Sequence, residues 1–235
     1  MALAVNQLSG FGAGGIGEVA DMTINFEDHA YIDSAATAFT FSDIDIGSTD
    51  AARSIILCAQ TTYADGQRTD GVTCTIDGTA MTLAATAWAS GGQNGAIFYK
   101  AFPSETTADF IVTWSGAVVA MAITVYKVTD LGAVLDTGAE SGGYLGSGDP
   151  FTDNVAVAAG GVAVAISGDN DGEAGGLLCS WTNLTEDVDQ KIGGYHAYSG
   201  ASAAISSTSA SLAITADWTG SPDNGSIVIA SFEKG

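Results

Sequence analysis

The sequence predicts an all-β protein, namely a jelly-roll-like β-sandwich built from two pseudo-repeats and preceded by an extended N-terminal arm. Three observations lead to this prediction. Short runs of β-branched and aromatic residues alternate with turns rich in Gly, Asp, Ser and Thr. The pattern of the first half recurs in the second half. Finally, the sustained i, i+3, i+4 apolar spacing of amphipathic helices is missing from the sequence.

Residues 1–35 differ in composition from the rest and are interpreted as an arm or an edge element. Their glycine-rich segment, 10–17, matches the pattern GxGxxG. A dinucleotide fingerprint needs a buried strand before that pattern and a helix after it, and neither is expected here. We therefore expect an extended arm, with one short strand at 22–26.

The first repeat, 36–130, contains strand signals at 54–59, 72–76, 80–84, 96–101, 109–114 and 120–128. In one of these runs Phe110, Val112 and Trp114 alternate with Ile111 and Thr113, which is the period of a half-buried strand. The dipeptide at 77–78 is Asp-Gly, a strong hairpin signal because both residues tolerate positive φ.

The second repeat, 151–235, follows a Gly- and Asp-rich linker at 131–150. The matched runs are Ile55–Ala59 with Val162–Ile166, Thr73–Thr75 with Leu178–Ser180, Ala96–Lys100 with Gly194–Tyr198, Trp114–Gly116 with Trp218–Gly220, and Val125–Lys127 with Ser231–Glu233. The copies form either two successive sandwiches or one merged sandwich over 36–235. We favour the merged form, because one copy alone offers few large core residues.

The composition narrows the range of partners. The chain has 235 residues, 46% of them hydrophobic, with 27 acidic and 6 basic residues and a net charge of −21. Such a surface repels phosphate backbones and anionic lipids, so neither nucleic acid nor membrane is an expected partner. No apolar run reaches the ~20 residues of a membrane-spanning helix. Because no basic residue precedes the first apolar stretch, synthesis in a cytoplasm without a secretory signal is expected.

Two weak binding sites are predicted. Trp88 stands in a Ser-, Gly- and Gln-rich stretch with Gln93 and Asn94, where an exposed indole and two amides could hold a sugar. Asp169, Asp171 and Glu173 resemble the start of a calcium loop. The twelfth position of that loop is a serine, so a solvated acidic hairpin is the simpler interpretation and any structural calcium remains a minor expectation.

No catalytic apparatus is recognisable, so an enzyme is not predicted. His29 and His196 are far apart in the sequence, and no GxSxG elbow presents a nucleophile. The three cysteines, Cys58, Cys74 and Cys179, have neither metal-ligand nor disulfide-framework spacing and are expected to be buried thiols. Trp114 and Trp218 occupy matched positions and are interpreted as core plugs. Because the chain has many acidic residues, a pair of catalytic carboxylates remains an open alternative.

The first repeat resembles a module of bacteriophage structural proteins. The resemblance lies in Ile44–Leu57, where an Ile-Gly turn and a small-residue stretch lead to an arginine and an apolar strand, and in Val72–Ala80, Ile97–Tyr99, Val112–Gly116 and Val125–Val128. It implies a non-enzymatic structural protein of the virion, a capsid decoration or cement protein. Its expected partners are other capsid or tail subunits and further copies of itself.

The same resemblance allows a head- or tail-fibre module that recognises a host surface glycan. A carbohydrate-active enzyme on a sandwich scaffold is the minor alternative. No catalytic residues are carried over by the resemblance.

Overall fold

The computed structural model describes residues 21–62, 71–88, 93–142, 150–170, 178–192, 196–219 and 225–235. All regular structure in these ranges is β-strand, which confirms the predicted all-β class. Among the described residues there is no helix, and therefore none long and apolar enough to cross a membrane. The glycine-rich segment 10–17 lies outside the described ranges.

The first half of the chain forms two antiparallel sheets. Its strands are β1 (Ile24–Ile32), β2 (Ala36–Asp45), β3 (Arg53–Thr62), β4 (Thr73–Ile76), β5 (Thr79–Ala80), β6 (Thr82–Trp88), β7 (Gln93–Ala101), β8 (Thr107–Val118) and β9 (Ala120–Thr129). The first inner sheet has the order β1-β9-β3-β7-β6, and the first outer sheet has the order β2-β8-β4-β5. The predicted hairpin at 77–78 joins β4 to β5, with Asp77 and Gly78 both at positive φ.

The second half repeats this arrangement. Its strands are β10 (Leu131–Ser141), β11 (Phe151–Val157), β12 (Val162–Asn170), β13 (Cys179–Thr182), β14 (Thr185–Ile192), β15 (His196–Ala204), β16 (Ser209–Trp218) and β17 (Gly225–Lys234). The second inner sheet has the order β10-β17-β12-β15-β14, and the second outer sheet has the order β11-β16-β13. Two sandwiches therefore form, rather than the favoured single sandwich over 36–235.

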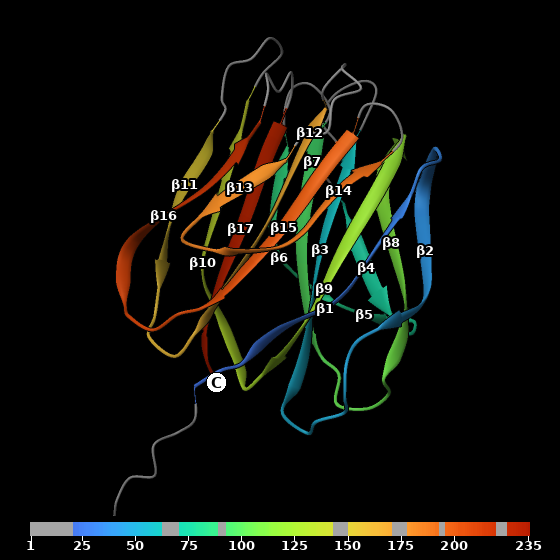
Figure 1. Ribbon diagram of the computed structural model, residues 1–235. Coiled ribbons are helices and arrows are strands. Elements are labelled where there is room, and N and C mark those ends of the chain that lie inside the picture. Colours follow the sequence, from blue (N-terminus) through green and yellow to red (C-terminus); the bar gives the residue numbers. More distant parts are fainter. Residues whose placement is uncertain are drawn as a thin grey trace, which may run out of the picture.

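The four sheets are stacked in layers. The outer strands β2 and β8 lie on one side of the molecule and β11 and β16 on the other, with both inner sheets between them (Figure 1). Three apolar cores separate the layers: one inside each sandwich, and a central core between the two inner sheets. Each inner sheet is therefore covered on both faces.

Burial on both faces explains why the central strands are apolar throughout. In β3, Ile55 and Leu57 belong to the core of the first sandwich, whereas Ile56 and Cys58 belong to the central core. Every residue of β3 is buried. A strand covered on both sides needs no polar alternation, and its sequence reads as a continuous hydrophobic run.

The structure corrects the alignment of the repeats. Ile56 pairs with Tyr126 in the first inner sheet, and Val162 pairs with Phe232 in the second, so Ile56 and Val162 are equivalent. The sequence comparison had matched Ile55 with Val162. A slip of one residue moves a side chain to the opposite face of its sheet. The matching of β7 to β15 was also displaced, because Gly95 of β7 corresponds to Gly200 and lies in the same register.

Side-chain contacts confirm the equivalence of the two halves. Thr61 Oγ1 donates to the carbonyl of Ala120, and Ser167 Oγ donates to the carbonyl of Ser226. Donors and acceptors are each 106 residues apart in the sequence. Cys74 and Cys179 are likewise buried between the inner and outer sheets of their own sandwiches.

The stretches interpreted as arm and linker each contribute an edge strand. Within residues 1–35, β1 pairs with β9, and within residues 131–150, β10 pairs with β17. The two strands occupy the same position in their sheets. The second repeat of the structure thus begins at Leu131, directly after Asp130, and not at residue 151.

The halves contact each other reciprocally across the central core. A Cβ built on Gly95 of β7 would lie 2.8 Å from Val228 Cγ1 of β17, and one built on Gly200 of β15 would lie 3.0 Å from Thr124 Oγ1 of β9. Equivalent glycines thus let each inner sheet approach the other closely. This reciprocity is typical of the contact between two identical subunits, here within one chain.

Candidate functional site

Among the described residues of the first half, Arg53 makes more side-chain hydrogen bonds than any other polar residue. It is 1% exposed, and its guanidinium donates to the backbone carbonyls of Ile46, Gly47, Ser48, Phe102, Ser104 and Glu105. The contacts to Phe102, Gly47 and Glu105 measure 2.7, 2.9 and 2.8 Å. Arg53 thereby holds the turn before β3 against the turn after β7, which is a structural role.

Charges around this arginine stabilise the same turn. Glu27 lies 3.9 Å from Lys127 Nζ, which also donates to Ser48 Oγ at 2.8 Å. Gly47, at φ 74°, packs directly on the Glu27 carboxyl, where a Cβ would lie only 2.6 Å away. Burial raises the pKa of Glu27 and lowers that of Arg53, while each group opposes the other's shift. The charged groups of this cluster therefore bind one another and the turn before β3.

The three predicted ligand contacts do not form one surface. Trp88, at the end of β6, keeps 40% of its surface exposed, but Gln93 and Asn94 on β7 are almost completely buried. Gln93 Nε2 donates to Thr62 Oγ1, and Gln93 Oε1 accepts from Gln60 Nε2, both at 2.9 Å. The Gln93 amide lies in the contact between the two inner sheets, whereas Asn94 lies on the opposite face of β7, with Ala96 and Phe98 of the first sandwich core. Of the three residues, Trp88 alone is therefore available to an external ligand.

The predicted calcium ligands are only partly described. Asp169 is fully buried on β12, on the face that also carries Ala163 and Ala165. Asp171 and Glu173 lie outside the described residues. Across the described ranges, no group of three or more His, Cys, Asp and Glu side chains is arranged to hold a metal. A calcium site therefore stays a prediction from the sequence.

The cysteines are free and buried, as expected. Burial raises the pKa of Cys74 to about 12 and shifts that of Cys58 in the same direction. His29 stacks on Phe26, with ring centroids 6.1 Å apart. Burial lowers the pKa of His196, which lies on β15. None of these groups is placed as a nucleophile with a neighbouring base.

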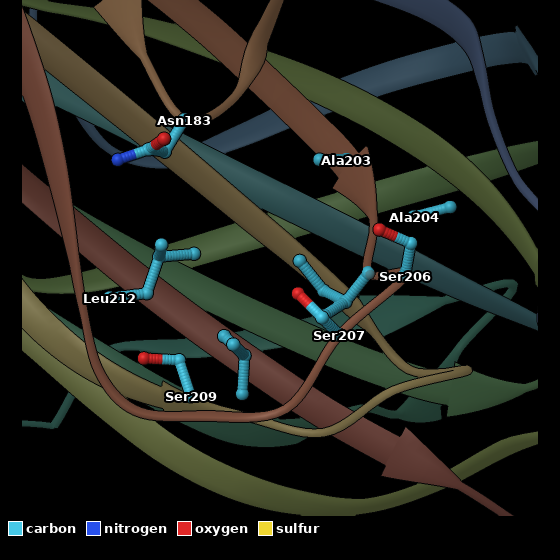
Figure 2. A pocket seen from close by; sticks show the side chains of 9 residues that line it. Asn183, Ala203, Ala204, Ser206, Ser207, Ser209 and Leu212 are labelled. Carbon is cyan, nitrogen blue, oxygen red and sulfur yellow. The ribbon is translucent and has the colours of Figure 1, made fainter.

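One pocket opens at an end of the second sandwich. It has a volume of about 190 Å³ and lies where β11 ends and β15 leads into β16. Figure 2 shows the hydroxyls of Ser206, Ser207 and Ser209 and the amide of Asn183 around it. The Asn183 amide already donates to the carbonyl of Ala213 at 2.7 Å. The lining offers hydrogen bonds but no ionisable side chain, and hence no acid–base chemistry.

Two acids on β14 escaped the sequence analysis. Asp187 and Asp189 flank Val188, which packs in the central core. Burial raises the pKa of Asp187, and it raises the pKa of Asp189 to about 6. The only signal in the sequence is that acids stand at alternate positions around a valine, a pattern also common on solvated strands.

The comparisons with known proteins give no relative. No family model matches the chain, and the search of curated proteins found nothing similar to it.

Proposed function

We propose that the chain is a non-enzymatic structural protein on the surface of a bacteriophage particle, most simply a capsid decoration or cement protein. The observation that carries the proposal is the strand order. We infer that each half is a jelly roll, because β1, β9, β3 and β7 face β2, β8, β4 and β5 in the order of that fold. Jelly rolls are frequent in viral capsid and lectin domains.

The role of Arg53 supports a structural rather than a chemical function. The run that resembles phage structural proteins, 44–57, contains both Gly47 and Arg53. Arg53 is entirely engaged by backbone carbonyls, and Gly47 packs on Glu27. The residues that carry the resemblance thus hold the turn before β3 against the turn after β7. Such a contact makes the sandwich rigid, as a structural protein of a particle requires.

The outer faces suit contact with other proteins. The first outer sheet presents Thr40, Ile111, Thr113, Thr73 and Thr75 on its open side. None of them is charged, although the whole chain carries −21. The middle of this face is therefore uncharged, while exposed Asp43, Asp45 and Asp109 lie towards one end of β2 and β8. An uncharged middle lowers the electrostatic cost of packing such an acidic molecule against capsid subunits or further copies of itself.

Counting copies in purified particles tests the proposal. Quantitative mass spectrometry of virions would compare this chain with the major shell protein, using a known tail protein as the reference for low copy number. A decoration protein should be present in a fixed ratio to the shell protein. Absence from the particle, or a copy number equal to that of the tail protein, would contradict this role.

A glycan-binding fibre module is the second candidate, and one observation favours it. Trp88 is an exposed indole on an inner-sheet edge strand, and such a ring can stack on a sugar. Trp88→Ala should then reduce adsorption to host cells or binding to host polysaccharide. Leu83→Ala is the matched control, since Leu83 lies on the same strand and is 43% exposed. Equal adsorption by both variants would exclude this use of Trp88.

A further inference from the structure

Strand β14 forms one edge of the second inner sheet and contacts two other layers of the molecule, the first inner sheet and the second outer sheet. Among the described strands, β15 is its one pairing partner. A register shift between Glu186 and Val188 places Asp187 in a bulge, where it faces the hydroxyls of Tyr126 and Ser202. Asp189 turns the other way, and its Oδ2 accepts the backbone N–H of Cys179 at 2.9 Å. One short strand thus reaches both the first sandwich and the second outer sheet through carboxyl groups.

Each of these carboxyls has one oxygen without a hydrogen bond. Asp187 Oδ2 and Asp189 Oδ1 are buried, and neither atom receives a hydrogen bond of normal geometry from a described residue, although the hydroxyls of Tyr126 and Ser199 lie near these two carboxyls. A buried carboxylate that lacks donors is unfavourable, whereas the protonated acid needs fewer of them. The equivalent edge strand of the first inner sheet, β6, carries no ionisable residue at all.

We propose that β14 is a proton-controlled latch between the two sandwiches, closed when Asp187 and Asp189 carry protons and loosened when both ionise. Closure keeps the bulge against Tyr126 and the carboxyl of Asp189 on the second outer sheet. Ionisation favours release of the strand into water, where both carboxylates are solvated.

Several other ionisable groups lie around the latch. On the side of the first inner sheet, Tyr198 of β15 pairs with Gln190 of β14 and interacts with Asp28 and Tyr31 of β1. The remaining groups are Tyr126 of β9 and Cys58 of β3 beside Asp187, Cys179 of β13 beside Asp189, Glu186 and Lys191 on β14 itself, and His196 of β15 opposite Ile192. Burial raises the pKa values of Tyr126 and Cys58, so both stay neutral near pH 7. The lowered pKa of His196 acts in the opposite sense, because its stabilisation is lost as the pH falls below the ordinary value of 6.5.

The sign of the effect follows from the raised pKa values of the two acids. Their contribution to closure is complete below the ordinary aspartate pKa of 3.8 and is lost as the pH rises through the folded value, about 6 for Asp189. With these two values, Asp189 alone raises the opening equilibrium of β14 about tenfold between pH 5 and pH 7. Asp187 acts in the same direction.

Hydrogen exchange of the full chain tests the latch. Opening of β14 would be measured at pH 5 and pH 7 in the wild type and in Asp187→Asn/Asp189→Asn, with rates corrected for the intrinsic pH dependence of exchange. The ratio of wild type to variant should rise about tenfold or more between the two pH values. Since both proteins retain His196, its opposing effect cancels in this ratio.

Two controls make the result specific. Strand β6 should show no change in the same ratio, because it has no ionisable side chain. Thr185→Ala, at an exposed and uncharged position of β14, should keep the wild-type pH dependence. A ratio that stays constant for β14, or one that rises equally for β6, would overturn the proposal. Should the variants not fold, a carboxyl NMR titration of the wild type decides, since an Asp189 that titrates near 3.8 is incompatible with the latch.

Discussion

Replacing Arg53 should destabilise the first sandwich more than any surface substitution. The guanidinium is buried and donates to six backbone carbonyls in two separate turns. A hydrogen bond to a charged group contributes ~1.5–3 kcal/mol, and bonds that share one donor group are not additive. Arg53→Met removes all six, and we expect a loss of about 4 kcal/mol in the free energy of unfolding.

Arg53→Lys is the more informative variant. An ammonium has three donors, so at least half of the carbonyls lose their partner although the positive charge remains. We expect a loss of about 2–3 kcal/mol, measured by urea denaturation followed through tryptophan fluorescence. Lys127→Met is the comparison, because it removes one ion pair with Glu27 at 3.9 Å and one hydrogen bond to Ser48, and it should cost less than either Arg53 variant. An Arg53→Lys variant within about 0.5 kcal/mol of the wild type would refute the reasoning.

Three further outcomes are expected. Gly200→Ala should lose about 1–3 kcal/mol of stability in thermal unfolding, because the new methyl would lie 3.0–3.1 Å from atoms of the opposite sheet; an unchanged melting temperature would argue against the close seam. Trp218→Phe should cost about 1 kcal/mol more than Trp114→Phe, since the Trp218 indole donates to Ser167 Oγ at 2.9 Å whereas no described residue accepts from that of Trp114; equal losses in urea unfolding would contradict this. Cys74 should resist alkylation in the native protein at pH 8, because burial raises its pKa to about 12, and rapid labelling detected by mass spectrometry would disprove its protection.

The sequence was informative wherever one face of a strand meets water. The alternation of Phe110, Val112 and Trp114 with Ile111 predicted β8 and the face that it buries. The positive φ of Asp77 and Gly78 was foreseen from the dipeptide alone. In both cases a local requirement, burial of one strand face or positive φ in a tight turn, restricts which residue types can stand there.

The sequence was uninformative wherever both faces are covered. The apolar run of β3 shows no period, so nothing distinguished Ile55 from Ile56 as the partner of Val162. For the same reason the stacking of two sandwiches could not be separated from one merged sandwich. Arg53 was recognised only as part of a resemblance, since its backbone acceptors, being carbonyls, have no sequence signature.

The candidate sites were the least predictable part. Trp88, Gln93 and Asn94 are close in the sequence, yet only the indole faces solvent. The sequence around Asp187 and Asp189 resembles that of an ordinary solvent-exposed strand. It does not show that the second inner sheet is covered by another sheet on each face.

When two identical chains associate through a common face, every substitution occurs on both sides of the contact simultaneously. Here the two sides are encoded separately, and they have diverged: Gln60 stands where the other half has Ile166. The glutamine donates to Gln93 and, at 3.4 Å, to Ser226 of the opposite half, while the isoleucine packs in the central core. A substitution can therefore change one side of this contact and leave the other side as it was, which is impossible in an assembly of two identical chains.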